Sequence, residues 1–212
     1  MRVRIKICGI TSVGDAQAVA EAGADAIGLM LWGPSKRFVT NAKAAEIVRS
    51  LPPFVSKVGV FVDPTAEEVF RAVKEIGLDT IQLHGEETPE FCRQFAPLKV
   101  MKAFRVKDAS SLVTLTDYNT DAWLLDSYVA GQQGGTGAVF NWDLAVQAKD
   151  SGKPIVLAGG LTPENIAEAV HEVWPYGVDV SSGVESAPGK KDAELIRRLV
   201  AGVRSVEVSE GG

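Results

Sequence analysis

The sequence predicts a single-domain (β/α)8 barrel, and three observations carry this prediction. Strand-like and helix-like runs alternate along the 212 residues without a linker-like change of composition, which is typical of α/β proteins. Eight pairs are present, at about 26 residues a pair, near the lower size limit of such a barrel. The pattern of glycine, apolar residue and aspartate recurs at residues 23–25, 77–79 and 177–179, where a helix is expected to end and a strand to begin.

The alternative architecture is a doubly wound open sheet. That fold usually has a glycine-rich loop after its first strand, whereas only Gly9 is available at this point of the sequence. The barrel is therefore the preferred prediction. Within it, Asp25 and Asp79 are expected to cap or orient the chain at the amino-terminal ends of the strands.

The first four strand and helix pairs rest on apolar runs and on capping residues. Ser12 precedes the first helix and Gly23 ends it, while Thr65 and Glu68 form a capping box at the third helix. The fourth helix begins at Thr88, which a proline follows. The expected segments are, in order, strand 3–8, helix 13–22, strand 26–30, helix 42–51, strand 55–62, a helix after Thr65, strand 80–83 and a helix from Thr88.

The second half continues the alternation up to a short tail. Thr162 and Pro163 stand in the order expected at a helix start, as cap and first residue, whereas the helical pattern from Ala109 is weak. Residues 1–205 are expected to form the barrel, and residues 206–212 a frayed carboxyl-terminal tail. The expected segments are strand 100–104, a helix from Ala109, strand 122–125, helix 143–149, strand 155–158, a helix from Thr162, strand 178–180 and helix 192–204.

Composition excludes several classes of protein. With a formal net charge of -5, the chain lacks the basic face that a nucleic-acid-binding protein needs. Two cysteines and two histidines are too few for a disulfide framework or a structural zinc site. Residues 1–7 lack the apolar core of a secretory signal, and no apolar run approaches the roughly 20 residues that span a membrane. We therefore expect a reduced, cytoplasmic protein with no metal, nucleic-acid or membrane partner.

Cys8 stands where the first strand ends, and active sites of such barrels lie at the carboxyl ends of the strands. Side chains alternate along a strand, so Cys8 shares a face with Lys6, while the apolar Ile5 and Ile7 share the other. The apolar face must lie against the helices, so Cys8 and Lys6 should point into the barrel. Lys6 is then about 7 Å along the strand from Cys8, and its ammonium group would favour a thiolate.

Asp126, at the end of the sixth strand, is the expected partner of Cys8. A thiolate can act as a base or a nucleophile, and a carboxyl group in a partly apolar pocket can stay protonated and act as an acid. Cys8 and Asp126 are therefore the candidate catalytic pair. The alternative for a free cysteine is a small buried hydrophobe, and this suits Cys92, which lies on a predicted helix beside Phe91 and Phe95.

Two glycine-bearing segments predict phosphate binding. Gly159 and Gly160 follow the seventh strand, and Ser182 and Gly183 follow the eighth. Glycine lets backbone N–H groups approach an anion, and helix amino termini add a positive dipole end, so the two loops together would cradle a phosphate. The alternative is that both are only tight turns. The glycine-rich loop 131–137 is expected to form a lid or wall, with a plain flexible loop as its alternative.

The segment Lys6-Ile7-Cys8-Gly9-Ile10-Thr11 resembles the opening signature of the phosphoribosylanthranilate isomerase family. Two positions depart from the family, since Asp63 stands where asparagine is common and Asn141 where aspartate is usual. Further blocks match the family in order along most of the chain, at residues 35–39, 58–62, 82–85, 134–137, 140, 142, 157–161 and 179–185.

The resemblance implies a cofactor-free (β/α)8 barrel that catalyses the Amadori rearrangement of N-(5-phosphoribosyl)anthranilate in tryptophan biosynthesis. In the family, the base that removes the proton at ribose C2 matches Cys8, and the acid that protonates the ring oxygen matches Asp126. Arg37 matches the residue that holds the anthranilate carboxylate, a task that suits a guanidinium group. The alternative for Arg37 is a solvated surface arginine.

His84 and Asp179 are further substrate-binding candidates. His84 follows the fourth strand and is expected to line the pocket or to make a structural hydrogen bond. Asp179 matches a family aspartate near the active site, and its position at a strand entrance leaves its role open. The implied partner is a small phosphosugar held on the two glycine-bearing loops, and the chain is expected to be a monomer or a homodimer.

Two functions of other classes stay open. The bifunctional barrel isomerase shared between histidine and tryptophan synthesis is expected to have an aspartate base at the end of its first strand, where this chain has Cys8. A non-catalytic phosphosugar-binding barrel would keep the phosphate loops and would have no reason to pair an inward thiol with Asp126. The thiol therefore favours the isomerase.

Overall fold

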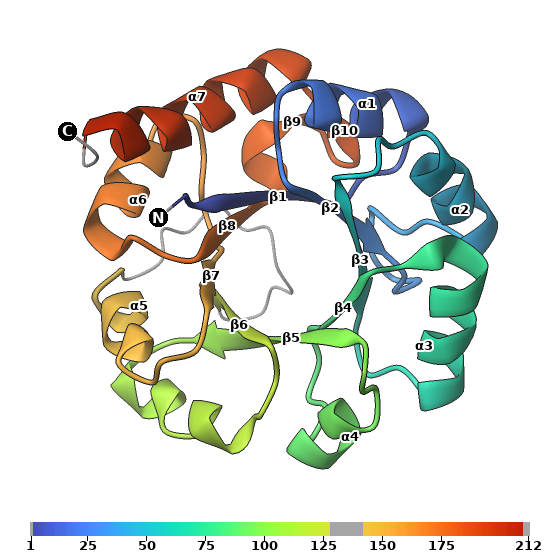
Figure 1. Cartoon of the computed structure of the whole chain (residues 1–212), viewed down its shortest axis with the longest axis horizontal. Coiled ribbons are helices and arrows are strands. Elements are labelled where there is room, and N and C mark those ends of the chain that lie inside the picture. Colours follow the sequence, from blue (N-terminus) through green and yellow to red (C-terminus); the bar gives the residue numbers. More distant parts are fainter. Residues whose placement is uncertain (1, 128–141, 210–212) are drawn as a thin grey trace.

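The structure is a computed structural model that describes residues 2–127 and 142–209. Eight parallel strands close into a barrel, which Figure 1 shows end-on, and strands adjacent in sequence are adjacent in the sheet. The ring closes where β8 pairs with β1, with Val178 beside Ile5. The prediction of a single-domain (β/α)8 barrel is confirmed. The strands are β1 (Arg4–Cys8), β2 (Ala26–Met30), β3 (Ser56–Phe61), β4 (Thr80–Leu83), β5 (Lys99–Val106), β6 (Ala122–Ser127), β7 (Ile155–Leu157) and β8 (Gly177–Val180).

The α-helices surround the ring of strands (Figure 1). The weak helical pattern after β5 corresponds to two 3-10 turns, η2 (Ala109–Leu112) and η3 (Leu115–Asp117). The carboxylate of Asp108 accepts hydrogen bonds from the backbone N–H groups of Ser110 and Ser111, and such local bonds favour a turn over a helix. The helices are α1 (Val13–Glu21), α2 (Asn41–Arg49), α3 (Ala66–Ala72) with a π-helical turn η1 (Val73–Gly77), α4 (Pro89–Arg93), α5 (Trp142–Lys149), α6 (Ile166–Val173) and α7 (Ala193–Ser209).

Helix caps agree with the sequence at three positions and differ at one. Ser12 caps α1, Thr65 and Glu68 form the capping box of α3, and Thr88 caps α4. The expected start of a helix at Thr162 is wrong, because α6 begins at Ile166. The side chain of Asn165 accepts from the N–H of Thr162 at 2.8 Å and donates to the carbonyl of Gly160 at 2.9 Å, which holds residues 162–165 in a turn.

Aspartates at the amino-terminal ends of the strands tie neighbouring strands together. Asp25 accepts from the N–H of Ile5, and Asp79 from the N–H of Lys57, both at 2.9 Å. The predicted orienting role of Asp25 and Asp79 is therefore confirmed. Asp179 differs because Gly177 is already the first residue of β8, whereas Gly23 and Gly77 lie three residues before β2 and β4. The third copy of the glycine and aspartate pattern therefore lies three residues deeper in its strand.

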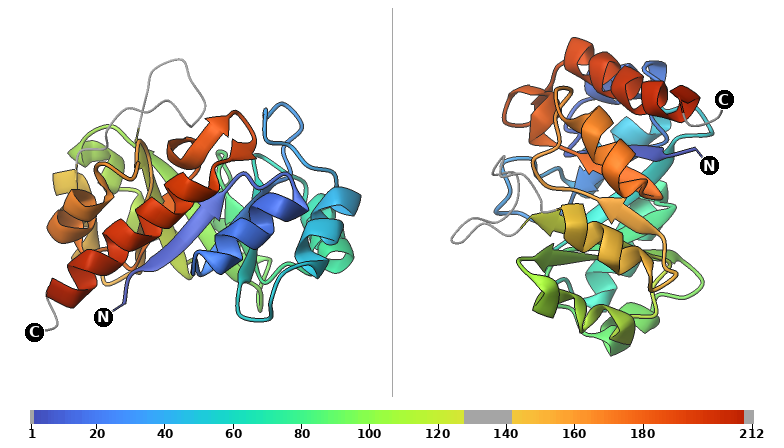
Figure 2. Two further views of the ribbon diagram at one scale, coloured as in Figure 1. Left: turned by 90° about the horizontal axis from the view of Figure 1, so that it is seen from above. Right: turned by 90° about the vertical axis from the view of Figure 1, so that its left-hand side faces the viewer.

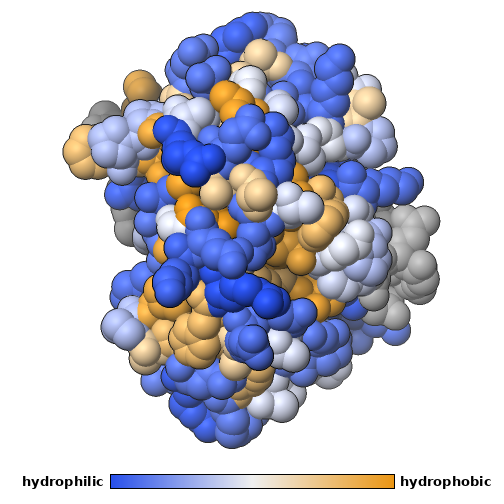
Figure 3. All heavy atoms as spheres, turned by 90° about the vertical axis from the view of Figure 1, so that its right-hand side faces the viewer, coloured by the Kyte–Doolittle hydropathy of each residue, from blue (hydrophilic) through white to orange (hydrophobic). Residues whose placement is uncertain are grey.

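Apolar residues form two layers, one inside the barrel and one between the strands and the helices. Ile5 and Ile7 are fully buried in the outer layer, as the alternation along β1 predicts. Figure 3 shows the side that carries α2 and α3, where hydrophilic residues cover most of the surface and apolar ones lie among them. The inner layer consists of Val58, Met101, Ala103, Leu124, Val156 and Ala158.

The start of β1 and the end of α7 lie close together at one end of the barrel, and the hairpin of β9 (Glu185–Ala187) and β10 (Lys190–Lys191) lies at the other (Figure 2). The described part of the expected frayed tail is helical, because α7 continues to Ser209. Val206 is buried with Leu199 and Val203, at the three- and four-residue spacing of one helix face. Residues 210–212 lie outside the described residues. No helix within residues 2–127 and 142–209 is long and apolar enough to cross a membrane.

Candidate active site

One pocket at the carboxyl ends of the barrel strands brings the predicted site residues together. It is open to solvent and contains side chains from every part of the ring of strands. The predicted loop 131–137 and Asn141 lie outside the described residues. All nine predicted site residues line the pocket: Cys8, Arg37, His84, Asp126, Gly159, Gly160, Asp179, Ser182 and Gly183.

Cys8 and Lys6 point into the barrel, as the alternation along β1 predicts. The ammonium group of Lys6 lies 2.8 Å from the carboxylate of Asp179, and both side chains are buried. Gly28 of β2 pairs in register with Cys8. A Cβ atom at Gly28 would lie 2.7 Å from Sγ of Cys8 and 3.0 Å from Nζ of Lys6, so the thiol and the ammonium group occupy the space that a side chain would need.

The thiol of Cys8 is not made acidic by its surroundings. Burial raises the pKa of Cys8, and the cations of Lys6 and Lys191 counteract this effect only in part. Lys6 is itself bonded to Asp179, whose charge also raises the pKa of the thiol. Lys6 lowers the pKa of Cys8, as expected, but burial raises this pKa by more.

We expect this raised pKa to be visible in the pH dependence of thiol reactivity. A thiolate forms only as the pH rises through the pKa of the group, and the thiolate is the species that iodoacetamide alkylates. The rate of alkylation of Cys8 should therefore increase with pH, with a midpoint above the ordinary value of about 8.5 for a cysteine. A midpoint below that value would contradict the structure.

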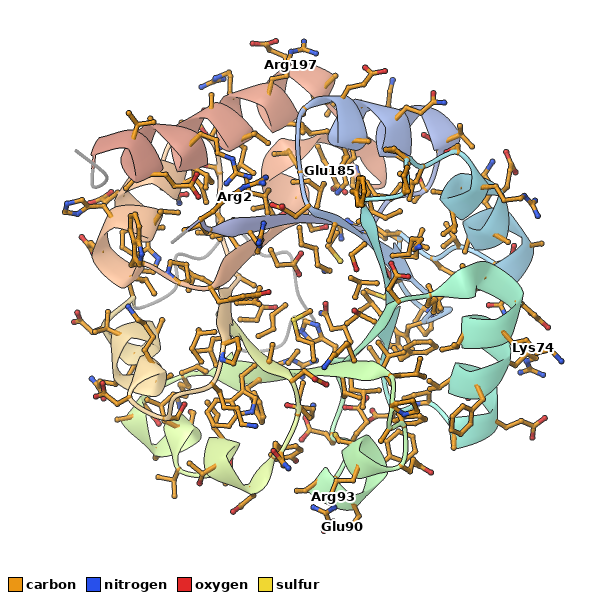
Figure 4. All side chains as sticks on the ribbon, viewed as in Figure 1. Arg2, Lys74, Glu90, Arg93, Glu185 and Arg197 are labelled. Carbon is orange, nitrogen blue, oxygen red and sulfur yellow. The ribbon has the colours of Figure 1, made fainter. Side chains whose placement is uncertain are left out.

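Arg37 is held in place by Glu185 of the hairpin. Its Nε and Nη2 atoms donate to the two carboxylate oxygens of Glu185 at 2.8 and 2.7 Å. Although burial opposes the charge of Glu185, hydrogen bonds from Arg37 and Lys191 hold its pKa below the usual range. In Figure 4, Glu185 lies close to the strands, while Arg93 and Arg197 lie on the outer rim.

The bidentate bond to Glu185 leaves the end of the Arg37 guanidinium group, with one N–H from each Nη atom, for a ligand. Gly9 makes this position possible, because its φ is +77° and a Cβ atom there would overlap Cδ of Arg37. The side chain of Arg37 is 19% exposed and ion-paired. It is therefore part of the pocket wall, and the alternative of a solvated surface arginine is wrong.

His84 connects Asp126 with Gln82. The Nε2 atom of His84 lies 3.5 Å from Oδ2 of Asp126, and its Nδ1 atom lies 3.0 Å from Nε2 of Gln82. With the amide of Gln82 donating to Nδ1, the proton of a neutral His84 is on Nε2, facing Asp126. Gln82 was not among the predicted site residues. Its Oε1 atom is buried without a hydrogen-bond partner among the described residues, and the residue lines the pocket.

A buried ion pair anchors the loop that carries His84. The ammonium group of Lys102 lies 3.0 Å from Glu87 and donates to the carbonyl of Gly85 at 2.7 Å. Glu87 accepts in turn from the N–H groups of Gly85 and Asp63. Asp63 has a left-handed backbone with φ of +47°, which aspartate and asparagine both tolerate.

Replacing Lys102 with methionine is expected to destabilise the protein by about 3–5 kcal/mol, because the carboxylate of Glu87 would stay buried without its partner. Urea denaturation measures the change. Lys99→Met is the matched control on the same strand, since Lys99 and Asp121 form an exposed pair whose loss has a much smaller effect. Equal effects of the two substitutions would contradict the anchoring role.

The loops after β7 and β8 form one continuous wall of the pocket. Gly159 and Gly160 have left-handed backbones, with φ of +87° and +64°, which favour glycine. A Cβ atom at Gly183 would overlap the carbonyl oxygen of Leu161, so the two loops touch there. The short 3-10 helix η4 (Ser182–Val184) follows β8, and the first N–H groups of such a helix have no acceptor within it.

The opposite wall is apolar and was not predicted residue by residue. It contains Met30, Trp32, Val60 and Val62, from β2, β3 and the segments that follow them. No group of three or more histidine, cysteine, aspartate or glutamate side chains within the described ranges could hold a metal ion. The pocket thus combines a glycine-lined wall, an apolar wall, a guanidinium group, a thiol and a carboxyl group.

This fold and this pocket define the class as a (β/α)8-barrel enzyme with its site at the carboxyl ends of the strands. The family model described as "N-(5'phosphoribosyl)anthranilate (PRA) isomerase" matches residues 5–202. An N-(5'-phosphoribosyl)anthranilate isomerase of Citrifermentans bemidjiense is 52% identical over 203 residues, which cover 96% of this chain and 98% of the relative. The chain therefore belongs to the N-(5'-phosphoribosyl)anthranilate isomerase family.

Solved structures agree with this assignment. The phosphoribosyl anthranilate isomerase of Thermotoga maritima superposes with a TM-score of 0.91 at 41% identity, covering 96% of this chain and 99% of that one. A second isomerase structure, in complex with reduced 1-(o-carboxyphenylamino)-1-deoxyribulose 5-phosphate, has a TM-score of 0.88 at 39% identity, with coverage of 96% and 99%.

Proposed function

We propose that this protein converts N-(5'-phosphoribosyl)anthranilate into 1-(2-carboxyphenylamino)-1-deoxyribulose 5-phosphate, in the biosynthesis of tryptophan. The observation that carries the proposal is a single pocket with a thiol on β1, a carboxyl group on β6, a guanidinium group on one flank and the glycine-lined loops on another. The complex of a relative with a reduced form of the reaction product supports it.

The substrate would be held at both ends. Its phosphate would lie against Gly159, Gly160, Ser182 and Gly183, where backbone N–H groups can surround an anion. Its carboxylate would bind the free end of the Arg37 guanidinium group, and its aromatic ring would lie on the apolar wall. This arrangement would place the ribose between Cys8 and Asp126.

Asp126 would begin the reaction as the general acid. Its proton goes to the ring oxygen of the furanose while the C1–O bond breaks and the anthranilate nitrogen forms an iminium with C1. The Nε2–H group of His84 faces Oδ2 of Asp126 and would hold the carboxylate in place once the proton has left.

After the ring has opened, Cys8 would act as the general base. The thiolate takes the proton from C2, and the electron pair of the C–H bond neutralises the iminium, which yields an enaminol. Loss of the O2 proton and protonation at C1 then give the ketone. C2 is oxidised and C1 is reduced within one molecule, so the reaction carries its own electrons and needs no cofactor.

Asp179 would act beneath the substrate. Its carboxylate lines the floor of the pocket and binds Lys6 under the thiol. We propose that the other carboxylate oxygen of Asp179 contacts the substrate.

A fluorescence assay that follows consumption of the anthranilate sugar tests the proposed function. We expect turnover by the purified protein, and strong competitive inhibition by the reduced product analogue. Absence of turnover, with phosphosugar binding retained, would favour the alternative of a non-catalytic binding barrel. Turnover of the histidine-pathway aldose as well would favour the bifunctional barrel isomerase.

The remaining proposals concern where and in what state the enzyme works. We place it in the cytoplasm, because a catalytic thiol must stay reduced and cytoplasmic thiols are kept reduced. A small phosphosugar is its proposed partner, and a monomer or a homodimer its proposed state. One relative, from Thermotoga maritima, is described as dimeric. Light scattering coupled to size exclusion distinguishes the two states.

A further inference from the structure

The hairpin of β9 and β10 contains a buried cation that no step above uses. The Nζ atom of Lys191 donates to Glu185 at 2.8 Å and to the carbonyl oxygen of Ser181 at 3.0 Å. Its side chain is 1% exposed. Burial of a lysine costs desolvation energy, so its ammonium group needs hydrogen-bond and charge partners that offset this cost.

The hairpin is bonded to the segment that follows Cys8, and Lys191 reaches the carbonyl of Ser181, whose hydroxyl bonds to Cys8. The hydroxyl of Thr11 donates to the carbonyl of Gly189 at 2.6 Å, and the hydroxyl of Ser181 donates to the carbonyl of Cys8 at 3.1 Å. Through Glu185, Lys191 is also connected to Arg37. Lys191 therefore lies at the junction between the predicted base and the predicted carboxylate-binding residue.

The five charged side chains that ion pairs connect beside Cys8 do not balance. Lys6 on β1, Lys191 on β10 and Arg37 after β2 are positive, while Asp179 on β8 and Glu185 on β9 are negative. Lys6 is compensated by Asp179, whereas Lys191 and Arg37 share Glu185. The cluster thus has an excess of one positive charge, and a thiolate at Cys8 would neutralise it.

We propose that Lys191 is a positioning residue of this site. Its ammonium group holds Glu185 and thereby Arg37, and it contributes to the excess positive charge of the cluster, which favours the thiolate of Cys8. The inference depends on the proposed function only for the roles of Cys8 and Arg37, and not for the electrostatic effect of Lys191 on the thiol.

The pH dependence of Cys8 alkylation by iodoacetamide, measured without substrate, tests the electrostatic effect. Mass spectrometry of peptides separates Cys8 from Cys92, whose pKa is raised by burial to about 11. We expect Lys191→Met to shift the alkylation midpoint upward by about one pH unit or more. Lys190→Met, one residue away and exposed, is the matched control and should leave the midpoint unchanged.

Lys191→Arg keeps the charge and serves as the conservative variant. Burial lowers the pKa of Lys191, against the effect of Glu185, whereas arginine stays charged throughout this pH range. The midpoint of Lys191→Arg should therefore equal that of the parent or lie below it. If Lys191→Met does not fold, Lys191→Gln, which keeps a hydrogen-bond donor without the charge, should show the same upward shift.

Steady-state kinetics tests the second part of the proposal. We expect Lys191→Met to raise KM, since Arg37 loses the support of Glu185, and to lower kcat at neutral pH with recovery at higher pH. In Lys191→Arg, which keeps the charge, kcat should return closer to its parental value than KM does. A folded Lys191→Met protein with the parental alkylation midpoint would overturn the inference. Because alkylation needs no turnover, failure of the proposed function would leave that measurement unaffected.

Discussion

Replacing Cys8 with serine is expected to lower kcat by at least about 100-fold, the usual scale for loss of a general base. Serine has nearly the same size, so the packing against Gly28 and Lys6 is kept. Its hydroxyl group is a far weaker acid than a thiol, and it is not deprotonated near neutral pH. Asp126→Asn should cause a loss of the same order, because the N–H protons of an amide are far too weakly acidic to be transferred to the ring oxygen.

Both variants are compared with the parent in the fluorescence assay, with KM and thermal stability measured beside kcat. We expect KM to change little, since neither side chain is proposed to hold the phosphate or the carboxylate. Cys92→Ala is the control, because Cys92 is buried in the outer apolar layer on α4, away from the pocket. Full activity of both Cys8→Ser and Asp126→Asn would refute the proposed mechanism.

Replacing Gly183 with alanine is expected to lower kcat/KM by about 100-fold, mainly through KM. The added methyl group would overlap the carbonyl oxygen of Leu161 and approach Cα of Thr162 at 3.2 Å. These are backbone atoms, so the loops after β7 and β8 must move apart. A displacement of about 1 Å in a binding loop can reduce catalysis about 100-fold.

Inhibition by inorganic phosphate shows where the Gly183 effect arises. We expect phosphate to compete more weakly with substrate in Gly183→Ala than in the parent. Gly14→Ala in α1 is the matched control, because only Oγ of Ser12, at 4.0 Å, lies near the added atom and alanine suits a helix better than glycine. Unchanged phosphate inhibition in Gly183→Ala would place the phosphate elsewhere.

Local chemistry explains the parts of the fold that were predictable. Ser12 and Thr65 cap their helices because their side-chain oxygens accept from N–H groups of the first turn, which have no acceptor within the helix. Ile5 and Ile7 face the helices and Cys8 faces the barrel because side chains alternate along a strand. The start of α6 was misplaced because the side chain of Asn165 bonds back to Thr162 and Gly160, a competition that spacing does not reveal.

Within the site, the sequence was sufficient for the residues that stand at strand ends. Cys8, His84 and Asp126 each follow from their place in a strand, and the family resemblance supplied Arg37 and Asp179. Glu185, Lys191 and Gln82 were missed as site residues. Their importance arises from contacts with residues far away in the chain, such as the bond between Glu185 and Arg37, 148 positions apart.

The sequence by itself determined the barrel, because eight alternating apolar runs of strand and helix length can bury their surfaces in few other ways. It also determined which residues reach the end of the barrel where the site lies. Only the tertiary structure decided the charge of that site. Burial and the pairing of Lys6, Asp179, Glu185 and Lys191 set the electrostatic surroundings of Cys8, and both depend on distances between strands that no local pattern contains.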